Sequence, residues 1–495
     1  IVIEGTNHKV TDNTVSNNDI GIQEQGGGHP MSNYVADNAG DGATDNGQSA
    51  NYFGRGNSPV ACGNTISGSM FSGNTQDLNT VLGGGSYGLV TNTNTGETFC
   101  SIQAAISDAQ TLDGHTLTVA AGNYPESVNV TKSLTITGSG NGSNPATSTV
   151  LSGTCSLTGF TVSAANVTLQ NMYVGGYQYA VTLNGVVNPT INNMALVDYC
   201  VAGVNFAGAN NTSVDITQTS MLRTTPMALS VGFRCGTGTA VNGLIIDGCT
   251  ITGNEQGAFI GQATSPVAFD NIIIRNSTIS NNTLKGLYFE KLSNATLENL
   301  VMDNNGTDPA YNSNAGIDIN LKYGNYSNIT IRNSDITNSG ATGSAVDPQM
   351  PAAITVKARN DGSYSGIPAT LTGVTIKNNF ITGPRNGIRF GEIGVVNNGP
   401  SNVTVEGNDL SYAFGNKAIA RRTNNDVNLL CNWHGNTSLP TILGTFAEAG
   451  TGNIILSSIL GTGGDASLAA GFQPSGSCTC PSGNLVTNTN TSETF

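Results

Sequence analysis

IIIRN at residues 272–276 is followed along the chain by ATLEN at 295–299, ITIRN at 329–333 and VTIKN at 374–378. In each stretch apolar residues stand at alternate positions, the first and the third, which is the period of a half-buried β-strand. Each ends on asparagine, a residue that tolerates a left-handed backbone and hydrogen-bonds its neighbours at turns. Such stretches recur at roughly 22 to 45 residues, a spacing typical of stacked repeats. The sequence therefore predicts short strands that return once per coil.

A second strand-like stretch follows in each coil, and its apolar residues also alternate. These second stretches are AVTLN at 180–184, AGVNF at 202–206, MALSV at 227–231, GAFIG at 257–261, GLYFE at 286–290, GIDIN at 316–320, AITVK at 353–357 and GIRFG at 387–391. Coils this short leave little room for crossover helices, so each strand must stack in parallel on the preceding coil. We therefore predict an all-β fold, a right-handed parallel β-helix solenoid.

The composition fits an extracellular protein and argues against several kinds of partner. Charged residues make up only 10% of the 495 residues, and the formal net charge is −14. An acidic surface repels phosphates and anionic membranes, and no apolar run reaches about 18 residues, so we expect neither nucleic-acid binding nor direct membrane insertion. Four histidines and the lack of a CxxC motif leave no recognisable metal site. We expect no cofactor, with Ca²⁺ the one ion that such an acidic surface suits.

A long-range echo sets the predicted domain organisation. LVTNTNTGETF at 89–99 returns as LVTNTNTSETF at 485–495, with ten of eleven positions identical. We therefore expect residues 1–88 to be the C-terminal part of a preceding repeat unit, residues 89–484 one complete unit, and residues 485–495 the start of the next. Within the complete unit we expect a helical cap at 100–110, coils over about 115–435, and an end cap or linker at 436–484.

The start of the complete unit predicts a short helix that covers the first coil. Ser101 suits an N-cap position, and the apolar residues Ile102, Ala105, Ile106 and Ala109 would lie on one helix face. A helix here would protect an open sheet edge, and we expect one such cap in each repeat unit. Residues 101–138, SIQAAISDAQTLDGHTLTVAAGNYPESVNVTKSLTITG, closely resemble the opening of pectin lyase-like β-helix domains. This resemblance covers most of 89–435 and implies the fold more than the function.

Two narrower resemblances bear on function. Pectin methylesterases share the GxYxE element, here Gly122 to Glu126, but their DFIFG-like and LGRPW-like elements are absent, which argues against esterase activity. TNTNTGETF, NWHG at 432–435 and GFQP at 471–474 resemble repeats of giant secreted proteins of the Bacteroidota. That likeness implies a surface adhesin. Trp433 is then expected to be a core or end-cap residue rather than a sugar platform.

Nine cysteines suggest disulfides outside the cell, with buried free thiols as the alternative. The echo places Cys100 directly after one TNTNTGETF motif, and Cys62 precedes it much as Cys478 and Cys480 precede the next. We therefore expect disulfides that link the end of one repeat unit to the start of the next. The candidates are Cys62, Cys100, Cys478 and Cys480.

The second strands predict a surface row, because the residues between their apolar positions point outward. This row consists of Thr182, Asn205, Ser230, Phe259, Tyr288, Asp318, Thr355 and Arg389, and beside it lie Glu290, Asn320, Lys357, Lys322 and Arg359. As a sugar groove, the row would stack Phe259 and Tyr288 on sugar faces, while the charged side chains bound hydroxyls or carboxylates. As ordinary solvated residues, the same side chains would only stabilise the stack. No catalytic residue is assigned.

Two functions follow from these observations. The first is a structural or adhesive repeat of a large extracellular surface protein or filament, because tandem units build length and present one surface many times. Its partners would be neighbouring repeat units of the same chain, glycans or other surface proteins, and further copies in a filament. The second is a carbohydrate-active β-helix enzyme, a polysaccharide lyase or glycoside hydrolase, with its groove on the parallel sheet. A lyase would need a basic residue, and a hydrolase would need two carboxylates.

Overall fold

The computed structural model describes residues 90–99, 101–342, 351–411 and 417–480, together with the backbone of eight short strands before residue 68. The chain divides into two compact units. Unit 1 comprises residues 1–180 and 190–195, and unit 2 comprises residues 181–189 and 196–495. Strands β18 (Tyr179–Asn184) and β20 (Ala195–Val197) contain the boundaries.

Unit 1 is made of parallel ladders that begin under a capping helix. Its strands from residue 90 onward are β9 (Val90–Asn92), β10 (Thr98–Phe99), β11 (Thr116–Val119), β12 (Gly122–Tyr124), β13 (Val128–Val130), β14 (Thr135–Gly140), β15 (Thr149–Ser152), β16 (Thr158–Val162), β17 (Thr168–Gly175) and β19 (Thr190–Asn192). Strands β11, β14, β17 and β19 pair in parallel, as do β12 with β15 and β13 with β16. Three strands therefore alternate in each coil.

The segment before residue 68 shows the same parallel pairing. Its strands are β1 (Val2–Glu4), β2 (Lys9–Thr11), β3 (Thr14–Ser16), β4 (Ile20–Gln25), β5 (Tyr34–Ala36), β6 (Ala39–Asp41), β7 (Ala50–Phe53) and β8 (Thr65–Ser67). They form the orders β1-β4-β7, β2-β5 and β3-β6-β8, all parallel. The assignment of this segment to a preceding repeat unit stays a prediction.

The predicted capping helix is present but shorter than expected. Helix α2 runs over Ile102–Ser107, and the Ser101 hydroxyl accepts a hydrogen bond from the Ala104 N–H at 3.0 Å. Ile102, Ala105 and Ile106 are buried, whereas Ala109 is exposed and lies outside the helix. The helix ends early because the Asp108 carboxylate accepts from the Gln110 N–H and turns the chain. A cap in every repeat unit stays a prediction.

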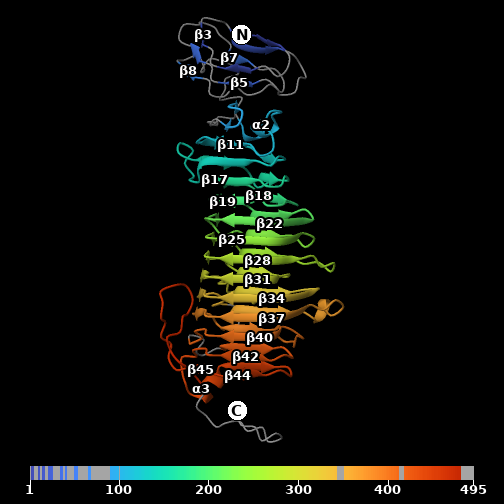
Figure 1. Cartoon of the computed structure of the whole chain (residues 1–495), viewed down its shortest axis with the longest axis vertical. Helices are drawn as coiled ribbons and strands as arrows, with labels where there is room; N and C mark the ends of the chain where they lie inside the picture. The colour runs from blue at the N-terminus through green and yellow to red at the C-terminus, as the bar shows by residue number, and fades with distance from the viewer. Residues whose placement is uncertain are drawn as a thin grey trace. The chain divides into compact units, whose positions relative to one another are not determined.

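Unit 2 is a stack of coils with three parallel faces (Figure 1). Face 1 holds β22 (Asn210–Thr217), β25 (Ala240–Asp247), β28 (Phe269–Arg275), β31 (Ser293–Glu298), β34 (Asn325–Arg332), β37 (Thr370–Lys377), β40 (Ser401–Glu406), β42 (Val427–Leu430) and β44 (Ile454–Leu456). Face 2 holds β23 (Ser220–Leu222), β26 (Thr250–Thr252), β29 (Thr278–Ser280), β32 (Val301–Asp303), β35 (Asp335–Thr337) and β38 (Phe380–Thr382).

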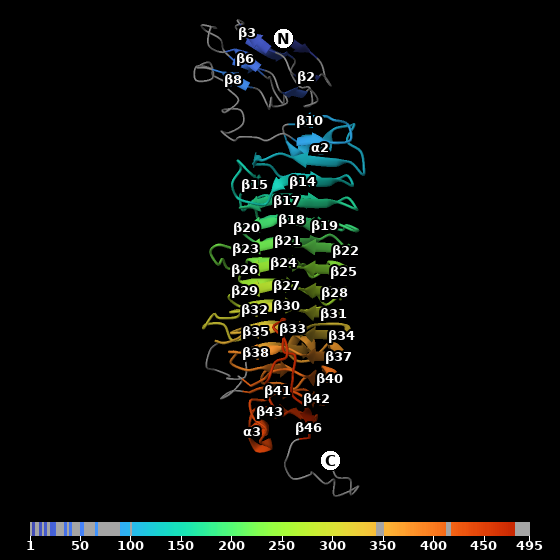
Figure 2. The same ribbon diagram turned by 60° about the vertical axis from the view of Figure 1, so that its left-hand side comes forward.

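Face 3 follows face 2 in each coil and carries the second kind of strand (Figure 2). It holds β21 (Ala202–Ala207), β24 (Val231–Cys235), β27 (Gln256–Ile260), β30 (Lys285–Phe289), β33 (Ala315–Leu321), β36 (Ala352–Ala358), β39 (Ile388–Phe390), β41 (Ile419–Arg422) and β43 (Phe446–Ala449). The short helix η2 (Gly362–Tyr364) lies between β36 and β37. These parallel faces establish the right-handed parallel β-helix.

The core is a set of stacked apolar columns, as the alternation predicts. Ile246, Ile274, Leu297, Ile331 and Ile376 occupy matching positions in successive strands of face 1, and each is fully buried. One coil alone would expose these side chains to water, whereas the stack removes them from it.

Asparagines with left-handed backbone mark the corners every five residues. In one coil Asn271, Asn276 and Asn281 have φ of 57°, 51° and 55°. The next coil repeats the spacing at 294, 299 and 304, and the one after it at 328, 333 and 338. Other coils place glycine at such corners, for example Gly243, Gly383 and Gly407, because glycine reaches positive φ without a Cβ clash.

The stack continues beyond the expected end of the coils at residue 435. Strand β43 pairs in parallel with β41, and β44 pairs in parallel with β42, so the ladders reach Leu456. Helix α3 (Leu439–Gly444) lies within this stretch. Strands β45 (Ile459–Leu460) and β46 (Cys478–Thr479) then form an antiparallel pair.

Candidate functional site

The strand register brings most of the predicted surface row together on face 3. Phe259, Tyr288, Asp318, Thr355 and Arg389 are consecutive register partners along β27, β30, β33, β36 and β39. Lys357 lies beside Asn320 in the neighbouring row. In an earlier coil, the Asn205 amide lies 3.5 Å from the Thr182 hydroxyl.

One member of the predicted row is wrong. Arg234, and not Ser230, is the register partner of Asn205 and Phe259. MALSV at 227–231 has the alternating pattern of a strand, but the segment is a turn. Leu229 has a φ of 67°, and the Ser230 hydroxyl donates a hydrogen bond to the Met227 carbonyl. The strand begins only at Val231.

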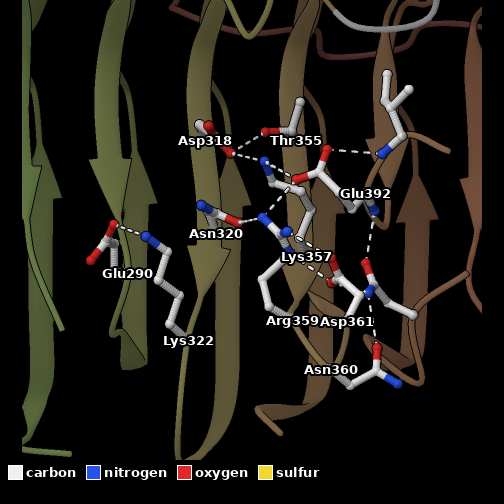
Figure 3. Close-up of polar contacts among 12 residues, drawn as sticks. Glu290, Asp318, Asn320, Lys322, Thr355, Lys357, Arg359, Asn360, Asp361 and Glu392 are labelled. Carbon is white, nitrogen blue, oxygen red and sulfur yellow. Dashed lines mark hydrogen bonds and ion pairs between the residues drawn. The ribbon is translucent and has the colours of Figure 1, made fainter. Parts of the chain in front are cut away.

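The row is buried from Tyr288 to Arg389, which sequence reasoning did not predict. The exposed fractions are 0% for Asp318, 1% for Thr355 and Arg389, 2% for Lys357 and 8% for Tyr288. Side chains that point away from the core were expected to be solvated. Instead they pack against one another and against residues from the connections, such as Tyr311 before β33. Glu392, after β39, is a second such residue (Figure 3).

Asp318 is the centre of this buried network. Its Oδ2 lies 2.5 Å from the Lys285 ammonium, and its Oδ1 accepts from the Thr355 hydroxyl at 2.5 Å and lies 3.1 Å from Lys357 Nζ. Burial disfavours the ionised carboxylate, but the positive charges of Lys285 and Lys357 outweigh it and hold the pKa of Asp318 well below its usual range. The Asp318 carboxylate is therefore ionised and fully partnered.

A second carboxylate links Lys357 to the next coils. Glu392 Oε2 lies 3.5 Å from Lys357 Nζ and 2.9 Å from an Arg359 nitrogen, and Glu392 Oε1 lies 3.8 Å from Arg389. Arg359 also pairs with Asp361 at 2.7 Å. Burial lowers the pKa of Lys357, whereas the nearby carboxylates of Asp318 and Glu392 oppose that shift.

A third group occupies the neighbouring end of the network. Glu290 pairs with Lys322 and accepts a hydrogen bond from the Tyr288 hydroxyl at 2.8 Å. The Asn320 amide in turn donates to the Tyr288 oxygen at 2.9 Å. Burial, with the added effect of the Glu290 charge, raises the pKa of Tyr288 far above its usual value. The Tyr288 hydroxyl therefore stays protonated and acts as a fixed donor.

A cation lies over Tyr288, one of the two rings that were expected to stack on sugars, and two more lie over Tyr364. Lys285 Nζ lies 3.8 Å from the centre of the Tyr288 ring, and Phe259 packs against the same ring at 5.6 Å between centroids. Tyr364 receives Arg359 and Lys322 at 4.6 and 5.3 Å from its ring centre. Such cation–π contacts stabilise the cluster and use the ring surface that a sugar would need.

The complete cluster holds five basic and four acidic side chains. The basic ones are Lys285, Lys322, Lys357, Arg359 and Arg389, and the acidic ones are Glu290, Asp318, Asp361 and Glu392. The whole chain has only 18 Lys and Arg residues, so the cluster concentrates them strongly. Across the described parts of the chain, no three His, Cys, Asp or Glu side chains gather closely enough to hold a metal ion.

Sequence reasoning missed Lys285, Asp361 and Glu392, together with the tyrosines at 311 and 364. Lys285 stands one position before the GLYFE stretch, so extending the strand by one residue would have included it. The other four lie in connections that follow no repeat. A separate hollow of about 440 Å³ was also missed. It lies at the turns from face 3 to face 1, and its lining includes Pro266, Asp270, Asn294 and Tyr326.

The cysteines differ in part from the predicted pairing. Cys478 forms a disulfide with Cys431, with Cα atoms 5.3 Å apart, so it does not link forward to a following unit. The β45–β46 pair causes this, because it returns residue 478 to the coil that carries Cys431. Cys480 is an exposed free thiol, and Cys62 and Cys100 lie outside the described residues. Cys155 and Cys200 each take part in a disulfide. Cys235 and Cys249 are buried free thiols.

Comparisons with known proteins find partial or distant similarity and assign the chain to no family. No protein-family model matches it. A 119-residue stretch is 34% identical to a cell surface glycoprotein of Methanothermus fervidus, and it covers 24% of this chain and 19% of that protein. No helix among the described residues is long and apolar enough to cross a bilayer.

Two solved structures align with this chain at low sequence identity. The A-module of the mannuronan C-5 epimerase AlgE6 from Azotobacter vinelandii is 14% identical, with 72% of this chain and 93% of that chain covered and a TM-score of 0.42. An alginate lyase from Paenibacillus sp. str. FPU-7 is 15% identical, with 71% and 94% covered and a TM-score of 0.35.

Proposed function

We propose that this chain is a length of an extracellular surface protein, in which the β-helix serves as a stalk and scaffold. The observation that carries the proposal is the closed charged cluster on face 3. A binding or catalytic groove needs charged groups that a substrate can reach, whereas Asp318 is fully buried and both of its oxygens have partners within the chain. Such a cluster joins neighbouring coils to one another.

Two further observations support a surface role. The matched stretch of the Methanothermus fervidus protein belongs to a cell surface glycoprotein. The disulfides suit an oxidising compartment outside the cell. The repeated TNTNTGETF motif supports a tandem array, whose neighbouring units would present the same lateral faces to glycans or other surface proteins.

Surface location is tested with antibodies against the purified chain. They should label intact cells of the source organism without permeabilisation, and brief external proteolysis should remove the label. Labelling that appears only after permeabilisation would contradict the proposal. An antibody against a cytoplasmic protein serves as the control for cell integrity.

The second candidate is a carbohydrate-active enzyme, and one observation favours it. Lys357 is a buried base candidate whose pKa is lowered by burial, and it lies beside the Asp318 and Glu392 carboxylates. The test is incubation with acidic polysaccharides, with detection of new unsaturated ends and new reducing ends. Turnover that disappears in the Lys357→Met variant but persists in Lys377→Met would establish this candidate in place of the stalk.

A further inference from the structure

Lys285 and Asp318 form an unusually close and dry pair between neighbouring coils. Lys285 starts β30 and Asp318 lies in the middle of β33, the next strand of face 3. Lys285 Nζ is 2.5 Å from Asp318 Oδ2, and the two side chains are 5% and 1% exposed. Two opposite charges held without water carry a desolvation cost that their attraction must offset.

The surroundings of this pair are those that a condensation reaction needs. The Tyr288 ring lies 3.8 Å from Lys285 Nζ, and the Tyr311 ring lies 5.7 Å from it, so aromatic surface keeps water from the amine. On the opposite oxygen of the carboxylate, Thr355 donates at 2.5 Å and Lys357 Nζ lies at 3.1 Å. One hydrogen-bond donor and one positive charge therefore face Oδ1, where negative charge would develop if a nucleophile added to the carboxyl carbon.

We propose that Lys285 and Asp318 condense to form an intramolecular isopeptide bond between adjacent coils of the β-helix. The pair is ionised at rest, and transient transfer of one proton along the short contact gives a neutral amine beside a neutral acid. Nζ then adds to Cγ, while Thr355 and Lys357 stabilise the charge on Oδ1. The Cγ–Oδ2 bond breaks, and Oδ2 leaves as water with two of the three ammonium protons. The products are one amide and one water, with no change of oxidation state and no co-reactant.

The bond would replace two buried charges by a neutral amide, and its carbonyl would keep the same donors. It would also tie strands that lie 33 residues apart in the sequence. In a stalk that carries load, such a tie resists the separation of neighbouring coils. The inference rests on the geometry of the pair and holds whether or not the proposed surface function is correct.

The chain offers a matched internal control. Lys377 and Glu406 are direct register partners on adjacent strands of face 1, with Lys377 Nζ 3.1 Å from Glu406 Oε1. Their side chains are 41% and 37% exposed. Water solvates both charges, so this pair should remain an ordinary ion pair although its separation is similar.

The test is the mass of the full chain after reduction, denaturation and alkylation, followed by peptide mapping. The mass should be lower than that of the sequence by one water. Digestion should give a branched peptide joining Lys285 to Asp318, and linear peptides for Lys377 and Glu406. A full mass with linear peptides at both positions overturns the proposal, and so does a branch at Lys357 in place of Lys285.

Variants then separate the roles of the neighbours. Lys285→Met should restore the full mass. Thr355→Val retains both reacting groups but removes one donor to Oδ1, so the bond should form on the order of 100-fold more slowly after synthesis. Thr355→Ser keeps the donor and should form the bond at nearly the normal rate. Equal rates in Thr355→Val and Thr355→Ser would contradict the assigned role of Thr355.

Discussion

Two buried polar ladders cross the same coils of unit 2, and they are built in opposite ways. One is neutral: Asn254, Asn282, Asn305 and Ser339 lie fully buried at the corner between faces 2 and 3, and each asparagine donates to the next member at 2.8 to 3.2 Å. The other is the charged cluster around Asp318 on face 3. The neutral ladder uses one residue type almost throughout, whereas the charged cluster changes its residues at every coil.

The neutral ladder is a feature that the β-helix can repeat in every coil, whereas the charged cluster is particular to this segment. An amide side chain is both a hydrogen-bond donor and an acceptor, so an asparagine in one coil can donate to the asparagine of the next coil, and the pattern can repeat in every coil. A charged ladder cannot repeat itself, because like charges on neighbouring strands repel and each ion needs an opposite partner. The charged cluster is therefore a local specialisation of the coils from β30 to β39.

The largest effect is expected from Asp318→Ala. This change leaves Lys285 and Lys357 buried without their shared carboxylate, which should reduce local stability by about 3–5 kcal/mol. Amide hydrogen exchange of β30, β33 and β36 measures the loss, with strands β22 and β25 of face 1 as the internal reference. Unchanged protection in β33 would show that the cluster contributes little.

Acid should open the end of the stack before it opens the charged cluster. Burial lowers the pKa of His434 from 6.5 to about 4. Between these two pH values His434 is protonated in the unfolded chain but neutral in the folded chain, so acid in this range favours unfolding. Stability near His434 should fall by about 3 kcal/mol over that window. The Asp318 network should persist, because the pKa of the free carboxyl lies well below the window and the proposed amide would not titrate in it.

His434→Phe is the matching variant, since His434 already packs against Phe446 at 5.8 Å between ring centroids. It should remove the loss of protection in β42 and β43 between pH 6.5 and 4, once the intrinsic pH dependence of amide exchange has been corrected for. A wild-type chain whose β30 to β36 region loses protection first on acidification would reverse the expected order.

A smaller effect is expected from Asn305→Ala in the neutral ladder. The change removes the oxygen that accepts a hydrogen bond from the Asn282 side-chain amide. The loss should reduce the free energy of unfolding by about 1–3 kcal/mol. The comparison is Asn299→Gly at an exposed corner of the same coil, which keeps the left-handed backbone at φ 52° and should cost far less. Urea unfolding of both variants measures the difference, and equal losses would mean that burial of the ladder is unimportant.

The smallest effect is expected from Lys377→Met. The Lys377–Glu406 pair spans adjacent coils as the Lys285–Asp318 pair does, but it is solvated and should contribute at most about 1 kcal/mol. The same exchange measurement applies to β37 and β40. A loss as large as that of Asp318→Ala would contradict burial as the reason for the difference between the two pairs.

The repeating features of this molecule could be predicted, and the irregular ones could not. The alternation in IIIRN and GIDIN fixes which residues enter the core, and the register places Tyr288, Asp318, Thr355 and Arg389 in one row. The burial of that row depends on partners such as Tyr311 and Glu392, which lie in connections without a period. Ser230 was misplaced because local alternation does not reveal a turn with positive φ at Leu229.

Lysine labelling of the native chain tests most directly whether the face 3 cluster is closed. A small amine-reactive reagent, applied briefly at neutral pH and followed by peptide mapping, should modify Lys377, which is 41% exposed, and spare Lys285 and Lys357, which are 5% and 3% exposed. Labelling of Lys357 at a rate similar to that of Lys377 would show an accessible basic groove on face 3, and it would favour the carbohydrate-active enzyme over the stalk.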